Sequence, residues 1–387
     1  MIPIISFFTG GGFMDMGFIE AGFDVVFSNE YNKEFAILHD YGMSSWAKHL
    51  NKNKEYNISY VGSITEITSN KILKSVFPNV TPSLWGIIGG PPCQDFTMNG
   101  KMDGFQGDRG KMTAIFFNRI RRMKPAFFVM ENVVGLLSNK ITKENMDSII
   151  KNYCSKEYYI DRKVLNALDF GVPQYRQRVF LVGVRKDLFK APHPELFTKQ
   201  DDICTMSFNW PKAIYKNAYK AYKWPQQNKF GDHPQKPDDI PLELCVEKCL
   251  KSINDNHVDN IDECLMLKKD ADKRKEINEG DTHRRSFKRL HRFRFSPTTC
   301  YGNNEVHLHP YENRRISVRE ALRIQGVDDS YILPKGKLSA KFKLIGNGVP
   351  VPLSRVVAES LLSFIHSFRK AENDITDSFM NKKIKAG

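Results

Sequence analysis

Short apolar runs alternate with helix-like segments through the first half of the chain. Continuous β-branched runs indicate buried strands, whereas apolar residues that recur with a helical period indicate amphipathic helices. The pattern predicts strands at residues 2–8, 24–29, 84–88, 126–130 and 179–184, and a helix at residues 14–22. Buried strands separated by helices are typical of a parallel sheet covered on both faces. We therefore predict an α/β fold.

The pattern changes after Arg185. Up to Asn304 the chain is rich in Lys, Asn, Asp and Pro, and it shows no clear alternation of strands and helices. Regular patterning then returns, because Ser317 and Glu320 fit a capping box at the start of a helix over 317–325, and residues 352–368 form a final amphipathic helix. We predict a catalytic and cofactor-binding domain at 1–185, a smaller inserted domain at 186–304, and a C-terminal return to the first domain at 305–387.

Charge narrows the class of partner. The 58 Lys and Arg residues exceed the 44 Asp and Glu residues, giving a net charge of +14. Such an excess favours a polyanion such as nucleic acid, although it could serve solubility alone. The N-terminus lacks the basic region of a signal peptide, and no apolar run approaches the ~20 residues of a membrane span. We expect a cytosolic protein without a membrane partner.

The seven cysteines are widely scattered and odd in number, which favours free thiols. Cys245, Cys249, His257 and Cys264 could be taken as a zinc cluster. Their spacing, however, is not a paired CxxC, and packing cysteines are the favoured interpretation. No metal is therefore predicted.

A glycine turn, Phe8-Thr9-Gly10-Gly11-Gly12, follows the first predicted strand and opens a helix. Glycines let the backbone approach a ligand, and a helix N-terminus supplies unpaired N–H groups. A nicotinamide dinucleotide fingerprint would need a third glycine where Asp15 stands, so pyrophosphate binding is weakly supported. Glu30 ends the second strand, where an acid accepts hydrogen bonds from ribose hydroxyls. A nucleoside cofactor is favoured, with a tight turn that binds no ligand as the alternative.

Cys93 lies in the segment 89–97, directly after an apolar strand, so it is expected on a loop at a carboxyl strand end. A packing cysteine is the alternative. The next strand ends in Glu131, on the same edge, where burial would raise the pKa of the carboxyl group. Arg176 and Arg178 precede the last strand. Paired arginines suit phosphate or a developing negative charge, with a surface salt bridge as the alternative.

Taken in order, these segments resemble the DNA (cytosine-5) methyltransferase family over nearly the whole chain. The matching segments are Phe8–Gly12, Asn29–Glu30, Pro91–Gln94, Asp108–Gly110, Glu131–Val133, Gln174–Arg178, Arg315–Glu320 and Gly346–Pro350. Eight matches in the family's order identify the chain as a member. The resemblance implies an S-adenosyl-L-methionine-dependent methyltransferase sheet, Rossmann-like, with a target recognition domain in the insert.

The resemblance also assigns the cofactor site. The residues implied to bind S-adenosyl-L-methionine are Phe8, Thr9, Gly10, Gly12, Glu30, Tyr31, Ser63, Ile64, Pro92, Asn347 and Val349. Two positions depart from the family pattern. Phe13 stands where the family has another glycine, which puts the packing of the loop in doubt. Ser63 stands where the family has an aspartate that accepts from the adenine amino group, so adenine binding is expected to be weaker.

The chemistry implied by the resemblance is attack of Cys93 on C6 of a cytosine flipped out of duplex DNA, which activates C5 for methylation. Arg176 is the candidate that lowers the pKa of the thiol, with Arg178 beside it. Glu131 is expected to engage N3 and the exocyclic amine, and Asn132 to hold the loop of Cys93. In the insert, the side chains expected to contact phosphates and base edges are Lys288, Arg289, Arg292, Phe293, Arg294 and Phe295.

Other functions stay open at this stage. A tRNA cytosine-5 methyltransferase of the same fold is the nearest alternative, although the long basic insert favours DNA. A DNA-binding homologue without activity would lack Cys93 or Glu131, and both are present. A nicotinamide oxidoreductase is disfavoured by Asp15. We expect a monomeric, nucleoid-associated enzyme, with any cognate restriction endonuclease acting separately.

Overall fold

The computed structural model describes residues 1–51, 54–92, 110–138, 140–189, 194–200, 203–255, 257–267, 272–299, 301 and 305–384. The strands are β1 (Ile2–Phe7), β2 (Phe23–Glu30), β3 (Tyr60–Val61), β4 (Gly86–Gly89), β5 (Phe127–Val133), β6 (Tyr158–Asn166), β7 (Gln177–Arg185), β8 (Phe197–Gln200) and β9 (Ile203–Met206). The α-helices are α1 (Phe13–Glu20), α2 (Lys33–His49), α3 (Ser69–Val76), α4 (Gly110–Met123), α5 (Gly135–Ser138), α6 (Lys140–Tyr153), α7 (Lys186–Phe189), α8 (Ala218–Ala221), α9 (Val318–Ile324), α10 (Leu338–Asn347) and α11 (Val351–Ile384).

The described strands form one nine-stranded sheet in the order β3-β2-β1-β4-β5-β7-β6-β9-β8. The first five strands of the chain pair in parallel, as predicted. The prediction of a wholly parallel sheet is wrong beyond β5, because β7 runs antiparallel to both β5 and β6. The reason is that β6 and β7 are joined by residues 167–176, which contain one 3-10 turn and no crossover helix, and such a connection pairs strands in opposite directions.

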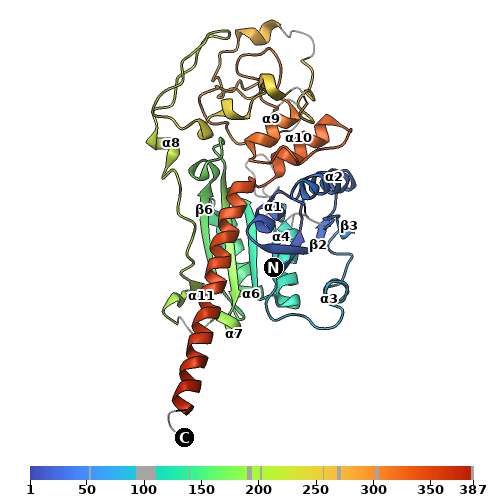
Figure 1. Ribbon diagram of the computed structural model, residues 1–387, viewed down its shortest axis with the longest axis vertical. Helices are drawn as coiled ribbons and strands as arrows, with labels where there is room; N and C mark the ends of the chain where they lie inside the picture. Colours follow the sequence, from blue (N-terminus) through green and yellow to red (C-terminus); the bar gives the residue numbers. More distant parts are fainter. Residues whose placement is uncertain are drawn as a thin grey trace.

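Helices cover both faces of the sheet, as the buried strands predicted. Successive residues of β5 show this: Phe127 and Val129 belong to one hydrophobic core, and Phe128 and Met130 belong to the other. The first core is closed by α1, α2 and α11, and the second by α3, α4 and α6. Figure 1 shows α11 running along the sheet and continuing beyond its lower end.

The predicted strands at 2–8, 24–29, 84–88, 126–130 and 179–184 correspond to β1, β2, β4, β5 and β7. Four strands, β3, β6, β8 and β9, were not predicted. Strands β8 and β9 extend the sheet beside β6, so the chain leaves the sheet after Met206. The division into domains itself remains a prediction.

Beyond Met206 the chain is irregular, as its composition indicated. Its regular pieces up to Thr299 are α8 and four short 3-10 turns at Leu242–Leu244, Val246–Cys249, Ile253–Asp255 and Asp272–Glu276, counted over the described residues. In Figure 1 this part lies above the sheet, with α9 and α10 between the two. The predicted capping box is confirmed, since the Ser317 hydroxyl accepts from the Glu320 N–H and the Glu320 carboxylate accepts from the Ser317 N–H.

The last two helices return the chain to the sheet. Within the described residues one segment, Leu338–Phe368, is long and apolar enough to cross a membrane by length and composition alone, and 56% of its apolar window is buried inside the structure. It contains α10 and the part of α11 that packs on α1 at Gly17, where a Cβ would lie 2.1 Å from the Ser354 hydroxyl oxygen. The apolar character of this segment is therefore explained by its packing in the hydrophobic core.

Candidate active site

One edge of the sheet collects most of the predicted site residues. Strands β1, β2, β4 and β5 are parallel, so their carboxyl ends meet there, and β7 begins at this edge because it runs the opposite way. In the ladder, Val133 at the end of β5 pairs with Arg178 at the start of β7. Topology alone therefore brings the glycine turn, Glu30, the Pro91–Pro92 segment, Glu131 and Arg178 to one place.

The glycine turn after β1 is shaped by left-handed backbone conformations. Phe8, Gly10 and Gly12 have φ values of 57°, 57° and 76°. The Glu30 carboxylate accepts from the Gly10 N–H at 3.0 Å and from the Asn32 N–H at 2.8 Å. The bond to Gly10 holds the glycine turn beside the end of β2. A Cβ built on Gly10 would meet no atom within 4 Å. Open space therefore lies directly above the turn, where a ligand could approach the backbone.

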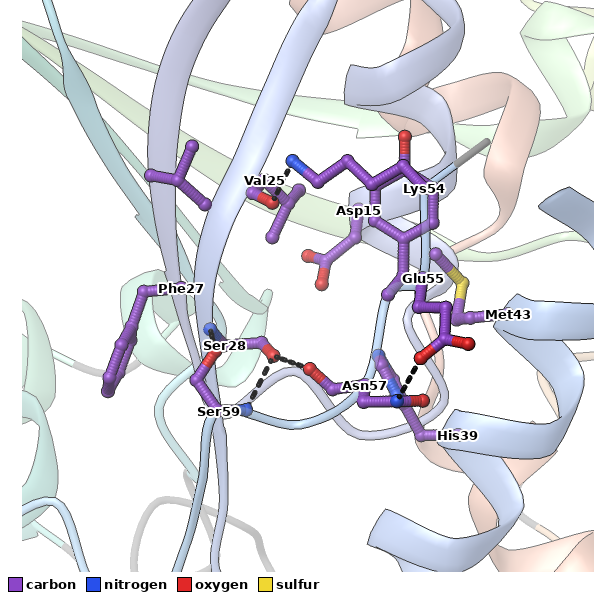
Figure 2. A pocket seen from close by; sticks show the side chains of 12 residues that line it. Asp15, Val25, Phe27, Ser28, His39, Met43, Lys54, Glu55, Asn57 and Ser59 are labelled. Carbon is purple, nitrogen blue, oxygen red and sulfur yellow. Dashed lines mark hydrogen bonds between the residues drawn. The ribbon is translucent and has the colours of Figure 1, made fainter. Parts of the chain in front are cut away.

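Asp15, which interrupts the dinucleotide fingerprint, holds the glycine turn in place through hydrogen bonds. Its buried carboxylate accepts from the Ser6 hydroxyl at 2.6 Å and from the Thr9 hydroxyl. Burial raises the pKa of Asp15. Asp15 also borders a cavity of about 80 Å³ between β2, α2 and the segment 54–59 (Figure 2). This cavity is large enough for water molecules, but it lies behind β2 and includes none of the predicted site residues.

The segment after β3 supplies the next part of the edge. The Asn29 amide donates to the carbonyls of Tyr60 and Gly62 at 3.0 and 2.9 Å, which holds this segment beside β2. The Ser63 hydroxyl lies 2.7 Å from the Thr65 hydroxyl, so the predicted adenine contact already has a partner. The Ile64 side chain is buried in the core, and its carbonyl accepts from the Arg119 guanidinium at 2.6 Å. Tyr31 is 73% exposed beside Glu30.

The C-terminal motif packs on the glycine turn from the opposite direction. Gly348 lies against the Phe13 ring, since a Cβ on Gly348 would come within 2.2 Å of it. The same ring meets Tyr331 edge-on at 5.3 Å, and the Tyr331 hydroxyl donates to the Gly11 carbonyl at 2.8 Å. Phe13 is thus accommodated by the missing side chain of Gly348. Asn347 is exposed next to it and Val349 is buried.

Glu131 forms a buried pair with Arg178 at this edge of the sheet. Its carboxylate lies 2.9 Å from the Arg178 Nε, and both side chains are about nine-tenths buried. Burial raises the pKa of Glu131 and outweighs the opposing charges of Arg178 and Arg176. A Cβ on Gly90 would lie 3.1 Å from the Glu131 carboxylate. The absence of a side chain at Gly90 therefore lets the acid approach the Pro91–Pro92 segment.

Asn132 and Arg176 connect the edge to other parts of the chain. The Asn132 amide donates to the Pro91 carbonyl at 3.1 Å, the contact expected of a residue that holds the loop. The Arg176 guanidinium is fully buried and donates to the carbonyls of Thr299, Gly346 and Gly348 at 3.0, 2.8 and 2.8 Å. Arg176 therefore joins the end of the insert to the C-terminal motif, while Arg178 pairs with Glu131.

A buried polar network surrounds Arg176. The Gln174 amide donates to the Gln325 side chain at 3.1 Å, and the Gln325 amide donates to the Ile345 carbonyl at 2.6 Å and to the Thr299 hydroxyl at 3.1 Å. Gln325 and Tyr331 were not among the predicted site residues. Their partners are distant in the chain, and no local motif marked them.

Some predicted contacts lie outside the described residues or are wrong. Cys93 and the Asp108–Arg109 segment belong to residues 93–109, which the structure does not describe, whereas Pro92 is exposed at their start. Arg289 and Arg292 were expected to contact DNA, but both are buried. Arg289 donates to the carbonyls of Ile277, Arg274 and His309 and stacks on Phe230, and Arg292 forms a two-point ion pair with buried Glu279.

The described residues contain no group of three or more His, Cys, Asp or Glu side chains that could hold a metal ion. The described cysteines considered for zinc, Cys245, Cys249 and Cys264, have free thiols. Burial raises the pKa of Cys245 and of Cys249 to about 12 each, which keeps these thiols protonated.

Comparisons with known proteins agree along the whole chain. The profile of the family described as C-5 cytosine-specific DNA methylase matches residues 2–363. The Type II methyltransferase M.NmeDI of Neisseria meningitidis serogroup C is 36% identical over 373 residues, which cover 94% of this chain and 84% of the relative. M.MthTI of Methanothermobacter thermautotrophicus is 30% identical over 366 residues, covering 93% and 97%.

Solved structures support the same fold. A protein encoded within an E. coli prophage superimposes with a TM-score of 0.65 at 23% identity, over 95% of this chain and 100% of that one. The S. pombe Dnmt2 methyltransferase gives a TM-score of 0.54 at 16% identity, over 94% and 98%.

The contact between Phe13 and Gly348 can be tested by a double-mutant cycle. We expect Gly348→Ala to lower the free energy of unfolding by about 1–3 kcal/mol, because the new methyl group overpacks the ring. In a Phe13→Ala background the same substitution should cost markedly less. Gly336→Ala is the matched control, since its nearest atom would lie 4.0 Å away. Urea unfolding measures the cycle, and equal costs in both backgrounds would contradict the contact.

Proposed function

The chain belongs to the C-5 cytosine-specific DNA methylase family, and from that premise we propose that it methylates C5 of a cytosine flipped out of a specific duplex DNA sequence, through a transient bond to Cys93. The chain is thus a DNA (cytosine-5) methyltransferase, and the proposal concerns its route. The observation that carries it is the buried Glu131–Arg178 pair beside the Pro91–Pro92 segment that leads to Cys93.

The residues at the edge fit S-adenosyl-L-methionine. The turn at Gly10 has open space above it, and the Glu30 carboxylate stands at the end of β2, where it would accept hydrogen bonds from the ribose hydroxyls. Exposed Tyr31 offers a ring to the adenine, and exposed Asn347 precedes Gly348, which packs on the ring of Phe13. When bound, this cofactor supplies an electrophilic methyl group.

Cys93 acts as the nucleophile. Its thiolate forms a bond to C6 of the cytosine, and the displaced electron pair makes C5 an enamine carbon that takes the methyl group. Loss of the C5 proton then returns the electron pair, breaks the bond between sulfur and C6, and restores the thiolate. A cytosine within the duplex cannot present C6 to the thiolate, so the base must be extruded first.

Glu131 and its neighbours prepare the base for attack. Burial raises the pKa of Glu131, which favours a protonated carboxyl group that can donate to N3. Positive charge on the ring favours addition of the thiolate at C6. Arg178 pairs with Glu131 and is therefore better placed than Arg176 to interact with the charge on this acid. The Arg176 guanidinium donates to main-chain carbonyls. Asn132 holds Pro91, and through it the start of the loop.

The irregular insert is proposed to recognise the DNA. Its first part carries the exposed lysines Lys216, Lys220 and Lys223 around α8, and none of them forms an ion pair within the described part of the chain. The Ala218 N–H donates to the Asp169 carboxylate in the connection between β6 and β7, which puts α8 at the active edge of the sheet. Unpaired lysines there suit the phosphates that flank the target base.

The names of the relatives support a proposal about the biological setting. M.NmeDI and M.MthTI are named Type II methyltransferases, and we infer that this chain, too, protects DNA at the sequence cut by a separate restriction endonuclease. It is proposed to act as a monomer in the cytoplasm, associated with the nucleoid. The net charge of +14 agrees with such a location.

Substitution of the nucleophile tests the proposed route. We expect Cys93→Ala to abolish transfer of labelled methyl from S-adenosyl-L-methionine to duplex DNA and to leave DNA affinity intact, because alanine cannot add to C6. Wild-type enzyme should label duplex DNA and not tRNA. Cys204→Ala, a substitution at a partly exposed cysteine, is the control. Methyl transfer by the Cys93→Ala variant would refute the nucleophile, and preferential labelling of tRNA would refute the substrate.

The lysines around α8 give a separate prediction about DNA binding. The Lys220→Gln, Lys223→Gln double variant should bind all duplex sequences more weakly. The slope of log affinity against log salt should fall by about 0.9 for each lysine that contacts a phosphate. The control is Lys74→Gln, Lys156→Gln, which removes the same charge from exposed positions outside the α8 segment. Equal salt slopes for the two double variants would contradict the proposed contact.

A further inference from the structure

A buried arginine of α4 binds the segment that follows β3. The Arg119 side chain is 9% exposed. Its guanidinium donates to the carbonyls of Ile64 and Ile67 at 2.6 Å each and to the Ser69 hydroxyl at 2.9 Å. All three acceptors are uncharged. Burial lowers the pKa of Arg119, with a smaller effect from the charge of Arg122.

Burying the Arg119 guanidinium costs free energy unless its three acceptors stay in place. A buried guanidinium loses its hydration, and within the described residues Arg119 has no carboxylate partner to offset that loss. Hydrogen bonds from a charged donor are the strong ones, so displacing the carbonyls of Ile64 and Ile67 would leave the charge poorly solvated. Arg119 therefore fixes residues 64–67 relative to α4.

The same segment is fixed from the side of β2. The Asn29 amide donates to the carbonyls of Tyr60 and Gly62. Ser63, the residue at the predicted adenine position, lies between the carbonyls bound by Asn29 and those bound by Arg119. Its hydroxyl is already bonded to that of Thr65. A purine bound here would therefore depend on main-chain groups of this segment. The positions of these groups are set by the hydrogen bonds from Asn29 and Arg119.

We propose that Arg119 is a positioning residue for the adenine of S-adenosyl-L-methionine, acting through the main chain of the Ser63–Ile64 segment that it holds in place. Arg119 does not touch the cofactor in this account. It sets cofactor affinity and the preference for adenine, and it leaves the rate of methyl transfer unchanged. The inference rests on the proposed use of this cofactor at the edge of the sheet.

The test uses the full chain and two ligands, S-adenosylhomocysteine and its inosine analogue, in which an oxygen replaces the adenine amino group. Wild-type protein should prefer the adenosine form. Arg119→Gln should raise the dissociation constant of that form about tenfold, the effect of losing one charged hydrogen bond, and it should reduce the preference between the two ligands. In steady-state assays the KM for S-adenosyl-L-methionine should rise with little change in kcat.

Arg122→Gln is the matched control, because it removes the same charge from an exposed position of the same helix. It should change neither the dissociation constants nor the KM. A general loss of stability would weaken both ligands in proportion, so an unchanged preference in Arg119→Gln would overturn the inference. If Arg119→Gln does not fold, Arg119→Lys decides, since one ammonium group cannot make all three bonds, and wild-type affinity and preference in that variant would also overturn it.

The outcome separates this inference from the proposed function. A wild-type chain that binds neither ligand and transfers no methyl group would remove the cofactor site altogether, and the role of Arg119 with it. A wild-type chain that binds and methylates normally, while Arg119→Gln behaves identically, would overturn only the role of Arg119.

Discussion

The structure depends on a constraint set by one buried cation. The Arg176 guanidinium is sealed from solvent, so its N–H groups must find acceptors inside the protein. Its two terminal nitrogens donate to the carbonyls of Thr299, Gly346 and Gly348, which come from the end of the insert and from the C-terminal motif. These segments lie more than a hundred residues from Arg176 in the sequence. Satisfying this one side chain therefore requires the insert and the C-terminal return to meet at the edge of the sheet where β7 begins.

The proposed chemistry lies at the same edge of the sheet, because the neighbouring arginine, Arg178, forms a different set of contacts. Arg178 is two residues further on, and its Nε pairs with the buried Glu131 while a terminal nitrogen donates to the Gln177 carbonyl. Burial raises the pKa of Glu131, while both arginines oppose the rise. Burial thus favours the protonated form of the acid, which suits a group that must donate to a base. Gly90 lets that acid reach the chain that leads to Cys93.

The sequence predicted what local patterns determine. Apolar runs located β1, β2, β4, β5 and β7, and the capping box of α9 was found from two residues. The antiparallel direction of β7 could not be predicted, because it depends on β6, a strand whose apolar pattern is interrupted by Asp161, Arg162 and Lys163. Contacts between distant segments were equally hidden: the Tyr331 hydroxyl reaches Gly11 across 320 residues. Charge also misled at Arg289 and Arg292, since composition does not distinguish an arginine that binds phosphate from one buried against carbonyls or against Glu279.

The central claim is that Cys93 bonds to the target cytosine, and a mechanism-based trap tests it most directly. The fluorine of 5-fluorocytosine cannot leave as the C5 proton does, so the reaction stops after methyl transfer with the sulfur still bonded to C6. Incubation with duplex DNA in which 5-fluorocytosine replaces cytosine throughout should give a denaturant-resistant protein–DNA adduct, formed only with S-adenosyl-L-methionine and mapped by mass spectrometry to Cys93. Enzyme that methylates ordinary duplex DNA but forms no such adduct would contradict the account.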